Sequence, residues 1–387
     1  MKNGEMVAAF EREFAAYVGA PYAIALCNGT ATLHTALAAL IAHEAPARHV
    51  HVPPLTMAST SIAVLHAGHV PTFRDVNRAT WLMELPEKPE DSFPAIPVAL
   101  YGLHYPHEGR PVIVDAAQTL QPFRDHQGRS PAFMSYSFQA SKILPLGEGG
   151  MLVTEDEGLA IRARRFSSLG YKLEAGQPRI DAKMLKHPSF ERHRTLGWNY
   201  RMNDLTAQEG LRLLGLPLQH ALRIRQDAAA LYFQAIAGCQ WLTPQHVPEG
   251  SAHDYWTYAL LTDTPERCLA LLDAIEKHGG ERPYPAWRLT YHEKAFEHLA
   301  PVVELGTTEA QNAIPDPEFF GDTGLAWNYG LCFNAESLQP RLLQFQTNDL
   351  ASAERNAKAL RLAIQDVERT QKVSRMFDGT VTGMLCE

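Results

Sequence analysis

Short apolar runs alternate with helix-forming stretches through the first half of this chain, and no other feature constrains its fold as strongly. The apolar runs predict strands at residues 22–26, 50–52, 70–75, 95–100, 112–115, 132–137 and 151–154. Residues 31–41 and 57–67 are typical of helices, and apolar residues recur at helical spacing between Val7 and Tyr17. Strands that alternate with helices favour an α/β fold, in which helices cover both faces of a largely parallel sheet.

The length of the chain, 387 residues, predicts a second domain, because a single small core does not hold so many residues. In the second half we expect helices at 203–214, from 219 onward, at 265–278 and at 348–369, with a strand at 256–261. We therefore predict a large domain at residues 1–218, a smaller α+β domain at 219–370 and a loosely held tail at 371–387. Residues 166–196 are interpreted as an irregular excursion.

Charge and composition argue against several classes of partner. The formal net charge is −8 and the chain has no basic run, which disfavours nucleic acid and anionic membranes. No apolar run is long enough to span a bilayer, and no signal peptide follows the N-terminus, so we expect a cytoplasmic protein. The five cysteines form no CxxC motif, and none of the 17 histidines lies in an HxxxH-type ligand pair with a carboxylate. This favours reduced thiols and no metal site.

Lys142 follows the predicted strand at 132–137 and precedes a Gly-Glu-Gly-Gly turn at 147–150. It is the only lysine between Lys88 and Lys172, and its neighbours are small or apolar. Burial lowers the pKa of a lysine, and the neutral amine that results can form a Schiff base. The alternative is a loop lysine whose ammonium group reaches the solvent.

Other polar residues also lie at predicted strand ends, where α/β sheets bind their ligands. A turn at residues 27–30 leads into a helix, so the amides of Thr30 and Ala31 and the Thr30 hydroxyl are candidate phosphate donors. Asp115 ends the strand at 112–115. Each feature has a simpler interpretation, because an Asn-Gly-Thr turn also begins ordinary helices and a strand-end carboxylate also caps turns.

Four segments then stand in a specific order and spacing. They are Asn28-Gly29-Thr30-Ala31, Asp115-Ala116-Ala117-Gln118, Ser137 to Lys142 with the Gly-rich turn, and Gly197-Trp198-Asn199-Tyr200-Arg201-Met202. Over residues 4–367 the chain resembles the DegT family of fold type I enzymes, which use pyridoxal 5′-phosphate (PLP) to aminate keto-sugars and keto-cyclitols. The resemblance implies an aminotransferase and a homodimer with shared active sites. It also implies a ping-pong reaction from glutamate or glutamine to a nucleotide-linked keto-sugar or a keto-cyclitol.

The resemblance implies a role for each residue around the PLP ring. Lys142 matches the Schiff-base lysine, which also serves as the general acid and base. Asp115 matches the aspartate that keeps the pyridinium nitrogen protonated, so that the ring acts as an electron sink. Gln118 matches the residue that hydrogen-bonds the ring oxygen. Met57 stands where the family usually has an aromatic residue stacked on the ring, and its thioether still offers a polarizable face.

Around the phosphate, Thr30, Ala31 and Ser137 match the family's cradle of neutral donors. Asn199 matches an asparagine that reaches the phosphate from the neighbouring subunit. The alternatives are that it caps the helix expected at 203–214 or lies in a loop of its own chain. Arg201 is suited to hold a substrate carboxylate, and the alternative is an ordinary surface arginine.

Some features bear on substrate and reaction type. Gln139 and Pro285-Ala286-Trp287-Arg288 resemble the cyclitol and aminoshikimate branch of the family. Relatives usually carry a segment ahead of the point where this chain starts, and it helps to line the active site. Lys142 disfavours the dehydratases in which His replaces the lysine. The alternatives are a PLP-dependent dehydratase or lyase on the same scaffold, or a non-catalytic sensor of PLP or sugar.

Overall fold

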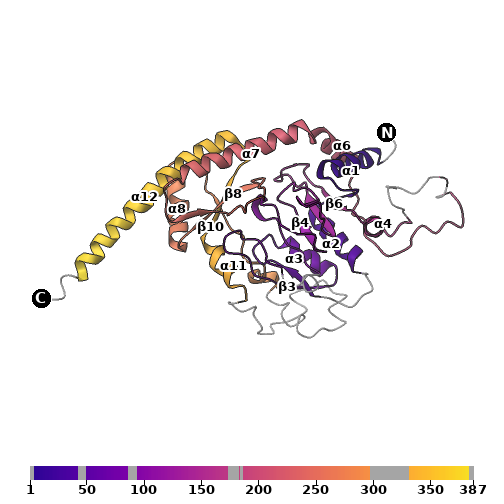
Figure 1. Ribbon diagram of the computed structural model, residues 1–387, viewed down its shortest axis with the longest axis horizontal. Helices are drawn as coiled ribbons and strands as arrows, with labels where there is room; N and C mark the ends of the chain where they lie inside the picture. Colours follow the sequence, from indigo (N-terminus) through magenta and orange to yellow (C-terminus); the bar gives the residue numbers. More distant parts are fainter. Residues whose placement is uncertain are drawn as a thin grey trace. The chain divides into compact units, whose positions relative to one another are not determined.

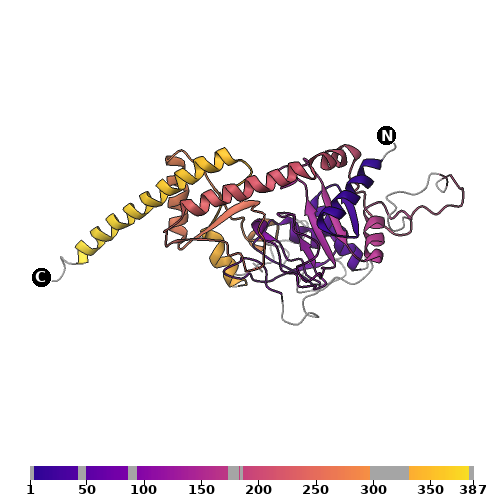
Figure 2. The same cartoon turned by 45° about the horizontal axis from the view of Figure 1, so that its top comes forward.

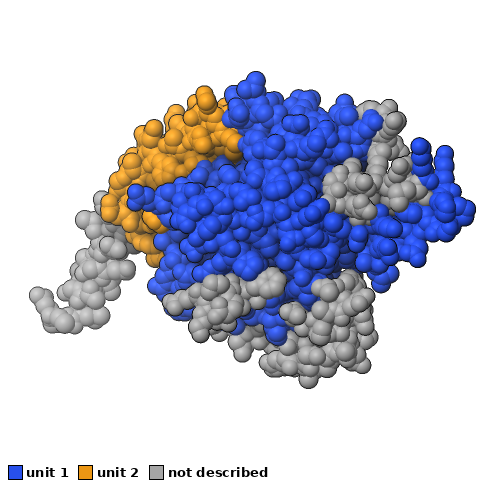
Figure 3. All heavy atoms as spheres, turned by 45° about the vertical axis from the view of Figure 1, so that its right-hand side comes forward, with its two compact units in different colours: residues 1–220, 247–254, 287–336 blue, residues 221–246, 255–286, 337–387 orange. Residues whose placement is uncertain are grey.

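The computed structural model describes residues 4–41, 49–85, 94–172, 183, 186–296 and 331–382, and Figure 1 shows their helices and strands. Two compact units divide the chain (Figure 3). The first comprises Met1–His220, Val247–Asp254 and Trp287–Glu336, and the second comprises Ala221–His246, Tyr255–Ala286 and Ser337–Glu387. The chain therefore returns to the first unit after it has entered the second.

The first unit is built on a sheet with the strand order β1-β6-β5-β4. Its strands are β1 (Tyr22–Leu26), β4 (Ile113–Asp115), β5 (Phe133–Ser137) and β6 (Gly150–Thr154). Strands β4 and β5 run parallel, whereas β6 is antiparallel to both β5 and β1. A second parallel pair consists of β2 (His49–Val52) and β3 (Val70–Phe73).

Residues 94–98 connect these two sheets. On one side the His51 amide donates to the Pro94 carbonyl at 3.0 Å, and on the other the Ile113 amide donates to the Ala95 carbonyl at 3.0 Å. The bridges that join this segment to β2 and β4 are parallel. The pairing therefore continues from β3 to β1 with parallel neighbours over most of its width, which confirms the predicted α/β class.

Helices cover both faces of this sheet. On β5, the Tyr136 ring packs 5.1 Å from Phe14 of α1 (Glu5–Val18), whereas the Ser135 hydroxyl lies 2.5 Å from Thr32 of α2 (Gly29–Leu40). Adjacent strand residues point to opposite faces, so α1 and α2 lie on opposite sides. The first unit also contains α3 (Ser59–His66), α4 (Glu157–Phe166) and α6 (Asp204–Leu213).

Two helix boundaries differ from the sequence analysis. Helix α4 occupies residues for which no helix was predicted. Its N-cap is Asp156, which accepts from the Leu159 amide at 2.8 Å, and Glu157 in the first turn favours the helix dipole. Helix α12 (Leu350–Thr382) continues past residue 369, so its predicted end came too early, and residues 383–387 of the expected tail lie outside the described residues.

The second unit is a small α+β unit around an antiparallel sheet with the order β7-β8-β10-β9. The strands are β7 (Leu242–Pro244), β8 (Thr257–Thr262), β9 (Tyr284–Pro285) and β10 (Leu342–Gln346). The helices are α8 (Pro265–Lys277), α12 and, from Ala221 onward, α7 (Leu216–Ala235). Tyr232 of α7 packs against Tyr258 and Phe345 with centroid distances of 5.2 and 4.7 Å. Figure 2 shows α8 and α12 together beside this sheet. Within the described ranges, no helix has the length and apolar character needed to cross a membrane.

Candidate active site

Asp115 ends β4 in a buried position, with 4% of its surface exposed. One carboxylate oxygen accepts from the Thr60 hydroxyl at 2.8 Å, and the other accepts from the Ala117 amide at 3.1 Å. Burial raises the pKa of Asp115, whereas these two hydrogen bonds and the charge of Lys142 act to lower it. The carboxylate therefore does cap its turn, as the simpler interpretation has it. Because burial disfavours its ionised form, a cationic partner would stabilise that form.

Lys142 lies in the turn that follows β5. Its amide donates to the Gln139 carbonyl at 2.8 Å, and the Ala140 amide donates to the Gly147 carbonyl at 2.9 Å. The side chain is half-buried, and desolvation lowers the pKa of Lys142 to about 8, while the Asp115 carboxylate acts to raise it. Asp115 and Lys142 each perturb the pKa of the other, so the two charges lie close enough to interact.

The N-terminus of α2 lies against the end of β5. A Cβ atom on Gly29 would stand 2.8 Å from the Ser137 Cβ, so a larger residue at this position would push Thr30 and Ser137 apart. Helix N-termini attract anions, and the hydroxyls of Thr30 and Ser137 are donors of the type that a phosphate accepts. The Ala31 amide donates instead to the Asn28 side chain at 2.8 Å, so the helix cap uses this predicted donor.

Gln118 is buried three residues after Asp115, with 3% of its surface exposed. Its side-chain oxygen accepts from the Tyr101 amide at 2.6 Å, which leaves the side-chain NH₂ as the donor for a further partner. Tyr101 has a φ of 63°, an unusual backbone conformation for a residue other than glycine. Gln118 stands in a recognisable sequence segment, whereas no motif marks Tyr101 or Thr60, so these two were not predicted.

Residues 198–201 pair with the chain on both sides. The Tyr200 amide donates to the Ser167 carbonyl at 3.0 Å, and the Tyr200 carbonyl accepts from the Cys27 amide at 2.8 Å. The rings of Trp198 and Tyr200 stack at 5.7 Å, and both pack against His34 of α2. Side chains alternate along an extended segment, so the intervening Asn199, and Arg201 after it, face away from His34. Both residues are exposed.

Asn199 and Met57 are the predicted cofactor-binding residues that are exposed. The N-cap of α6 is Asn203, whose side chain accepts from the Thr206 amide at 2.9 Å, so Asn199 does not cap this helix. Met57 is 53% exposed and lies just before α3. About half of this residue is therefore open to solvent.

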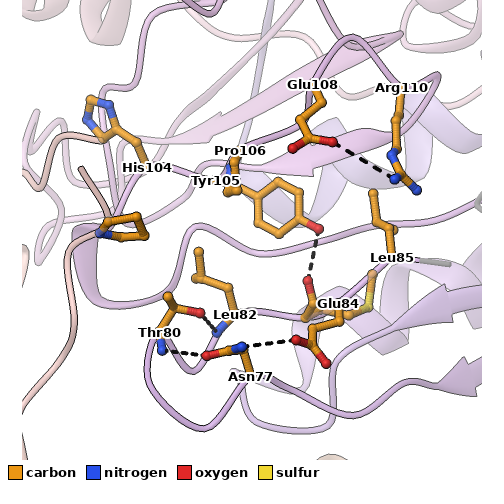
Figure 4. Close-up of a pocket in the computed structure, with 12 residues that line it drawn as sticks. Asn77, Thr80, Leu82, Glu84, Leu85, His104, Tyr105, Pro106, Glu108 and Arg110 are labelled. Carbon is orange, nitrogen blue, oxygen red and sulfur yellow. Dashed lines mark hydrogen bonds and ion pairs between the residues drawn. The ribbon is translucent and has the colours of Figure 1, made fainter. Parts of the chain in front are cut away.

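The first unit has an open hollow of about 480 Å³ at a different place (Figure 4). It lies between residues 77–85 and 104–110, where the Tyr105 hydroxyl donates to the Met83 carbonyl at 2.9 Å. None of the predicted site residues lines it. Among the residues that the structure describes, no group of three or more His, Cys, Asp or Glu could hold a metal ion.

Comparison with known proteins indicates an aminotransferase family. The model of the DegT/DnrJ/EryC1/StrS aminotransferase family matches residues 1–91 and 105–316. GDP-perosamine synthase of Caulobacter vibrioides is 28% identical over 320 residues, which span 77% of this chain and 80% of that protein. 3-Amino-5-hydroxybenzoate synthase of Amycolatopsis mediterranei is 27% identical over 319 residues, 77% of each chain.

A solved structure supports the same fold. NtdA from Bacillus subtilis, with bound cofactor PMP, superposes with a TM-score of 0.72 at 20% sequence identity. The match covers 94% of this chain and 78% of that one. Fold and comparisons together define a PLP-dependent aminotransferase of fold type I. The chain belongs to the DegT/DnrJ/EryC1/StrS aminotransferase family, whose members act on sugars and cyclitols.

Proposed function

We propose that this enzyme moves an amino group from glutamate or glutamine to a keto-sugar or keto-cyclitol, in two half-reactions at one site. The observation that carries the proposal is the pair of interacting charges at the ends of β4 and β5: Asp115 is buried, and the pKa of Lys142 is lowered to about 8. An amine with this pKa is a nucleophile and a proton carrier near neutral pH. The names of the two relatives, a perosamine synthase and an aminohydroxybenzoate synthase, support both acceptor classes.

Each candidate residue fits one part of PLP. PLP supplies an electron sink when it is bound. Lys142 would hold it through the side-chain nitrogen, and that nitrogen would carry the proton between the two carbons involved. Asp115 would face the ring nitrogen and keep its proton in place, because a buried carboxylate is stabilised by a cation. The Gln118 side-chain oxygen already accepts from Tyr101, so its NH₂ group would donate to the ring oxygen, and the exposed Met57 would cover the ring face.

The phosphate end supports a homodimer with shared sites. Gly29 brings the hydroxyls of Thr30 and Ser137 to the N-terminus of α2, which suits a dianion. Asn199 and Arg201 face away from their own His34, toward solvent. We propose that they reach the phosphate and a substrate carboxylate of the partner subunit.

The surface near Asn199 also fits a protein interface. Leu196, Trp198 and Leu205 are 81%, 48% and 76% exposed, and apolar residues of this size lose solvent exposure when two copies associate. All four cysteines in the described ranges are free thiols, which fits a reducing compartment such as the cytoplasm.

Spectroscopy tests the proposed function. Purified protein loaded with PLP should lose the visible absorption of the bound cofactor when glutamate or glutamine is added, and a suitable keto-sugar or keto-cyclitol should restore it. Borohydride reduction before donor is added should fix the cofactor to the peptide that contains Lys142. Absence of any spectral change with either donor would favour a lyase or a sensor. Cofactor fixed on another lysine would remove the structural basis of the proposal.

A further inference from the structure

Asp254 lies against the turn that carries Gln118, and no motif in the sequence marks it. One of its carboxylate oxygens accepts from the Leu120 amide at 2.8 Å and from the Thr119 hydroxyl. The same oxygen is 3.2 Å from the side-chain nitrogen of His104. The carboxylate thus holds the two residues that directly follow Gln118.

The other side of this turn is fastened to residues 101–105. Gln118 accepts from the Tyr101 amide at 2.6 Å. Gln121 makes a two-way contact, because its side chain accepts from the Tyr105 amide at 2.7 Å and donates to the Tyr105 carbonyl at 2.8 Å. Side chains therefore fix residues 118–121 from two directions, with Asp254 on one and residues 101–105 on the other.

The segment that leads into β4 has an unusual structure, which explains why side chains are needed to fix the turn at residues 118–121. Parallel neighbours in a sheet are normally joined by a crossover helix. Here residues 99–112, all of them described, join residues 94–98 to β4 with only the short 3-10 turn at Leu100–Gly102. Residues 252–254 pair with this connection, since the His104 amide donates to the Ala252 carbonyl at 3.0 Å and the Asp254 amide to the Gly102 carbonyl at 2.8 Å.

The charge of Asp254 strengthens its hold. Burial acts to raise the pKa of this carboxyl, but His104, Thr119 and the Leu120 amide lower it below its ordinary value overall. The group is therefore ionised at neutral pH and acts only as an acceptor. Hydrogen bonds to an ionised acceptor are stronger than neutral ones, so the loss of the charge should loosen the turn.

We propose that Asp254 is a positioning residue for cofactor binding, which fixes Thr119 and Leu120 and thereby keeps the Gln118 carboxamide aimed at the ring oxygen of PLP. The inference rests on the proposed function, in which Gln118 contacts the cofactor. Asp254 does not touch the cofactor in this account and acts through the turn at residues 118–120. Its removal should therefore alter cofactor affinity and absorption, beyond any change in folding stability.

Four variants test the inference. Asp254→Asn removes the charge, Thr119→Val removes the hydroxyl that Asp254 accepts, and Thr119→Ser keeps that hydroxyl. Asp125→Asn is the matched control, because Asp125 also fixes a loop of the first unit by accepting from the amides of Gln127 and Arg129, both at 2.9 Å. For each variant, the PLP dissociation constant, the absorption spectrum of the bound cofactor and the melting temperature are measured.

We expect Asp254→Asn and Thr119→Val to raise the PLP dissociation constant about tenfold and to shift the cofactor absorption, the size expected for one lost hydrogen bond to a charged group. Thr119→Ser and Asp125→Asn should stay within about twofold of wild type, less than the effect of a typical lost hydrogen bond. Unchanged cofactor affinity and absorption in both Asp254→Asn and Thr119→Val, with Lys142 still labelled in the wild type, would overturn this inference alone. No labelling of Lys142 in the wild type would overturn the proposed function and this inference with it.

Discussion

At the ring end of the proposed cofactor site, Asp115 and Gln118 are 4% and 3% exposed, and each accepts a hydrogen bond from its own chain. At the phosphate end, Asn199 and Arg201 are exposed, and the neighbouring Trp198 is 48% exposed. Buried polar groups need partners within the fold, whereas exposed ones are available to another molecule. The contrast supports our proposal that one chain completes the ring end and that a second copy completes the phosphate end.

The largest effect is expected from a substitution at the ring end of the site. Asp115→Asn keeps the shape of the side chain and removes the charge that would hold the proton on the ring nitrogen. The turnover number should fall by several orders of magnitude, which corresponds to about 4 kcal/mol or more in the barrier. Steady-state kinetics measure it, with circular dichroism as the check on folding. Activity within about tenfold of wild type, roughly 1.4 kcal/mol, would mean that Asp115 only caps its turn.

Thr60 tests whether the ring end depends on support from its own chain. Thr60→Val removes the hydroxyl that donates to Asp115 at 2.8 Å and keeps the shape, so the Asp115 carboxylate keeps only the hydrogen bond from the Ala117 amide. We expect a cost of about 1.5–3 kcal/mol in kcat/KM, the range for a hydrogen bond to a charged group. Thr60→Ser retains the hydroxyl and is the control. Equal activity in both variants would contradict the prediction.

The lowered pKa of Lys142 predicts how the reactivity of its amine changes with pH in the protein without cofactor. Desolvation lowers this pKa from 10.5 to about 8, so the reactive neutral amine is the minor form below pH 8 and the major form above it. The labelling rate of Lys142 by trinitrobenzenesulfonate should rise about tenfold per pH unit below 8 and level off above. Peptide mapping separates Lys142 from the other lysines. A rate that still rises steeply between pH 9 and 10 would show that the amine is not desolvated.

Met57 should give the smallest effect, because it lies on the exposed side of the proposed site. Met57→Phe introduces an aromatic ring where the family resemblance implies one, and ring stacking contributes about 0.5–1.5 kcal/mol. We expect PLP to bind up to about tenfold more tightly, with little change in turnover. Weaker binding by Met57→Phe, measured against Met57→Leu as the apolar control, would place this side chain away from the ring.

The sequence pattern predicted site residues that lie at strand ends. It did not predict residues that support the site from segments far away in the sequence. Asp115, Ser137 and Lys142 follow apolar runs, so the α/β pattern alone placed them at one edge of the sheet. Thr60, Tyr101 and Asp254 have no such signal. Their roles depend on contacts between segments 17 to 135 residues apart, which only the folded chain brings together.

The boundary differences have similar physical causes. Helix α4 carried a start signal in Asp156 and Glu157, which was not recognised as the beginning of a helix. Strand β10 was not predicted, although four of its five residues are buried between β8 and β9. Whether so short a segment forms a strand depends on its neighbours in the sheet, and the local sequence pattern does not reveal these neighbours.

Subunit mixing tests the central contrast most directly. Lys142→Ala lacks the cofactor lysine, and Asn199→Asp places a carboxylate against the phosphate, so each variant alone should be nearly inactive. In a mixed dimer one site combines an intact Lys142 with the intact Asn199 of the partner. After verified exchange of equal amounts, about a quarter of wild-type activity should return, since half of the dimers are mixed and each holds one whole site. No recovery would mean that both residues act within one chain, and would contradict the shared site.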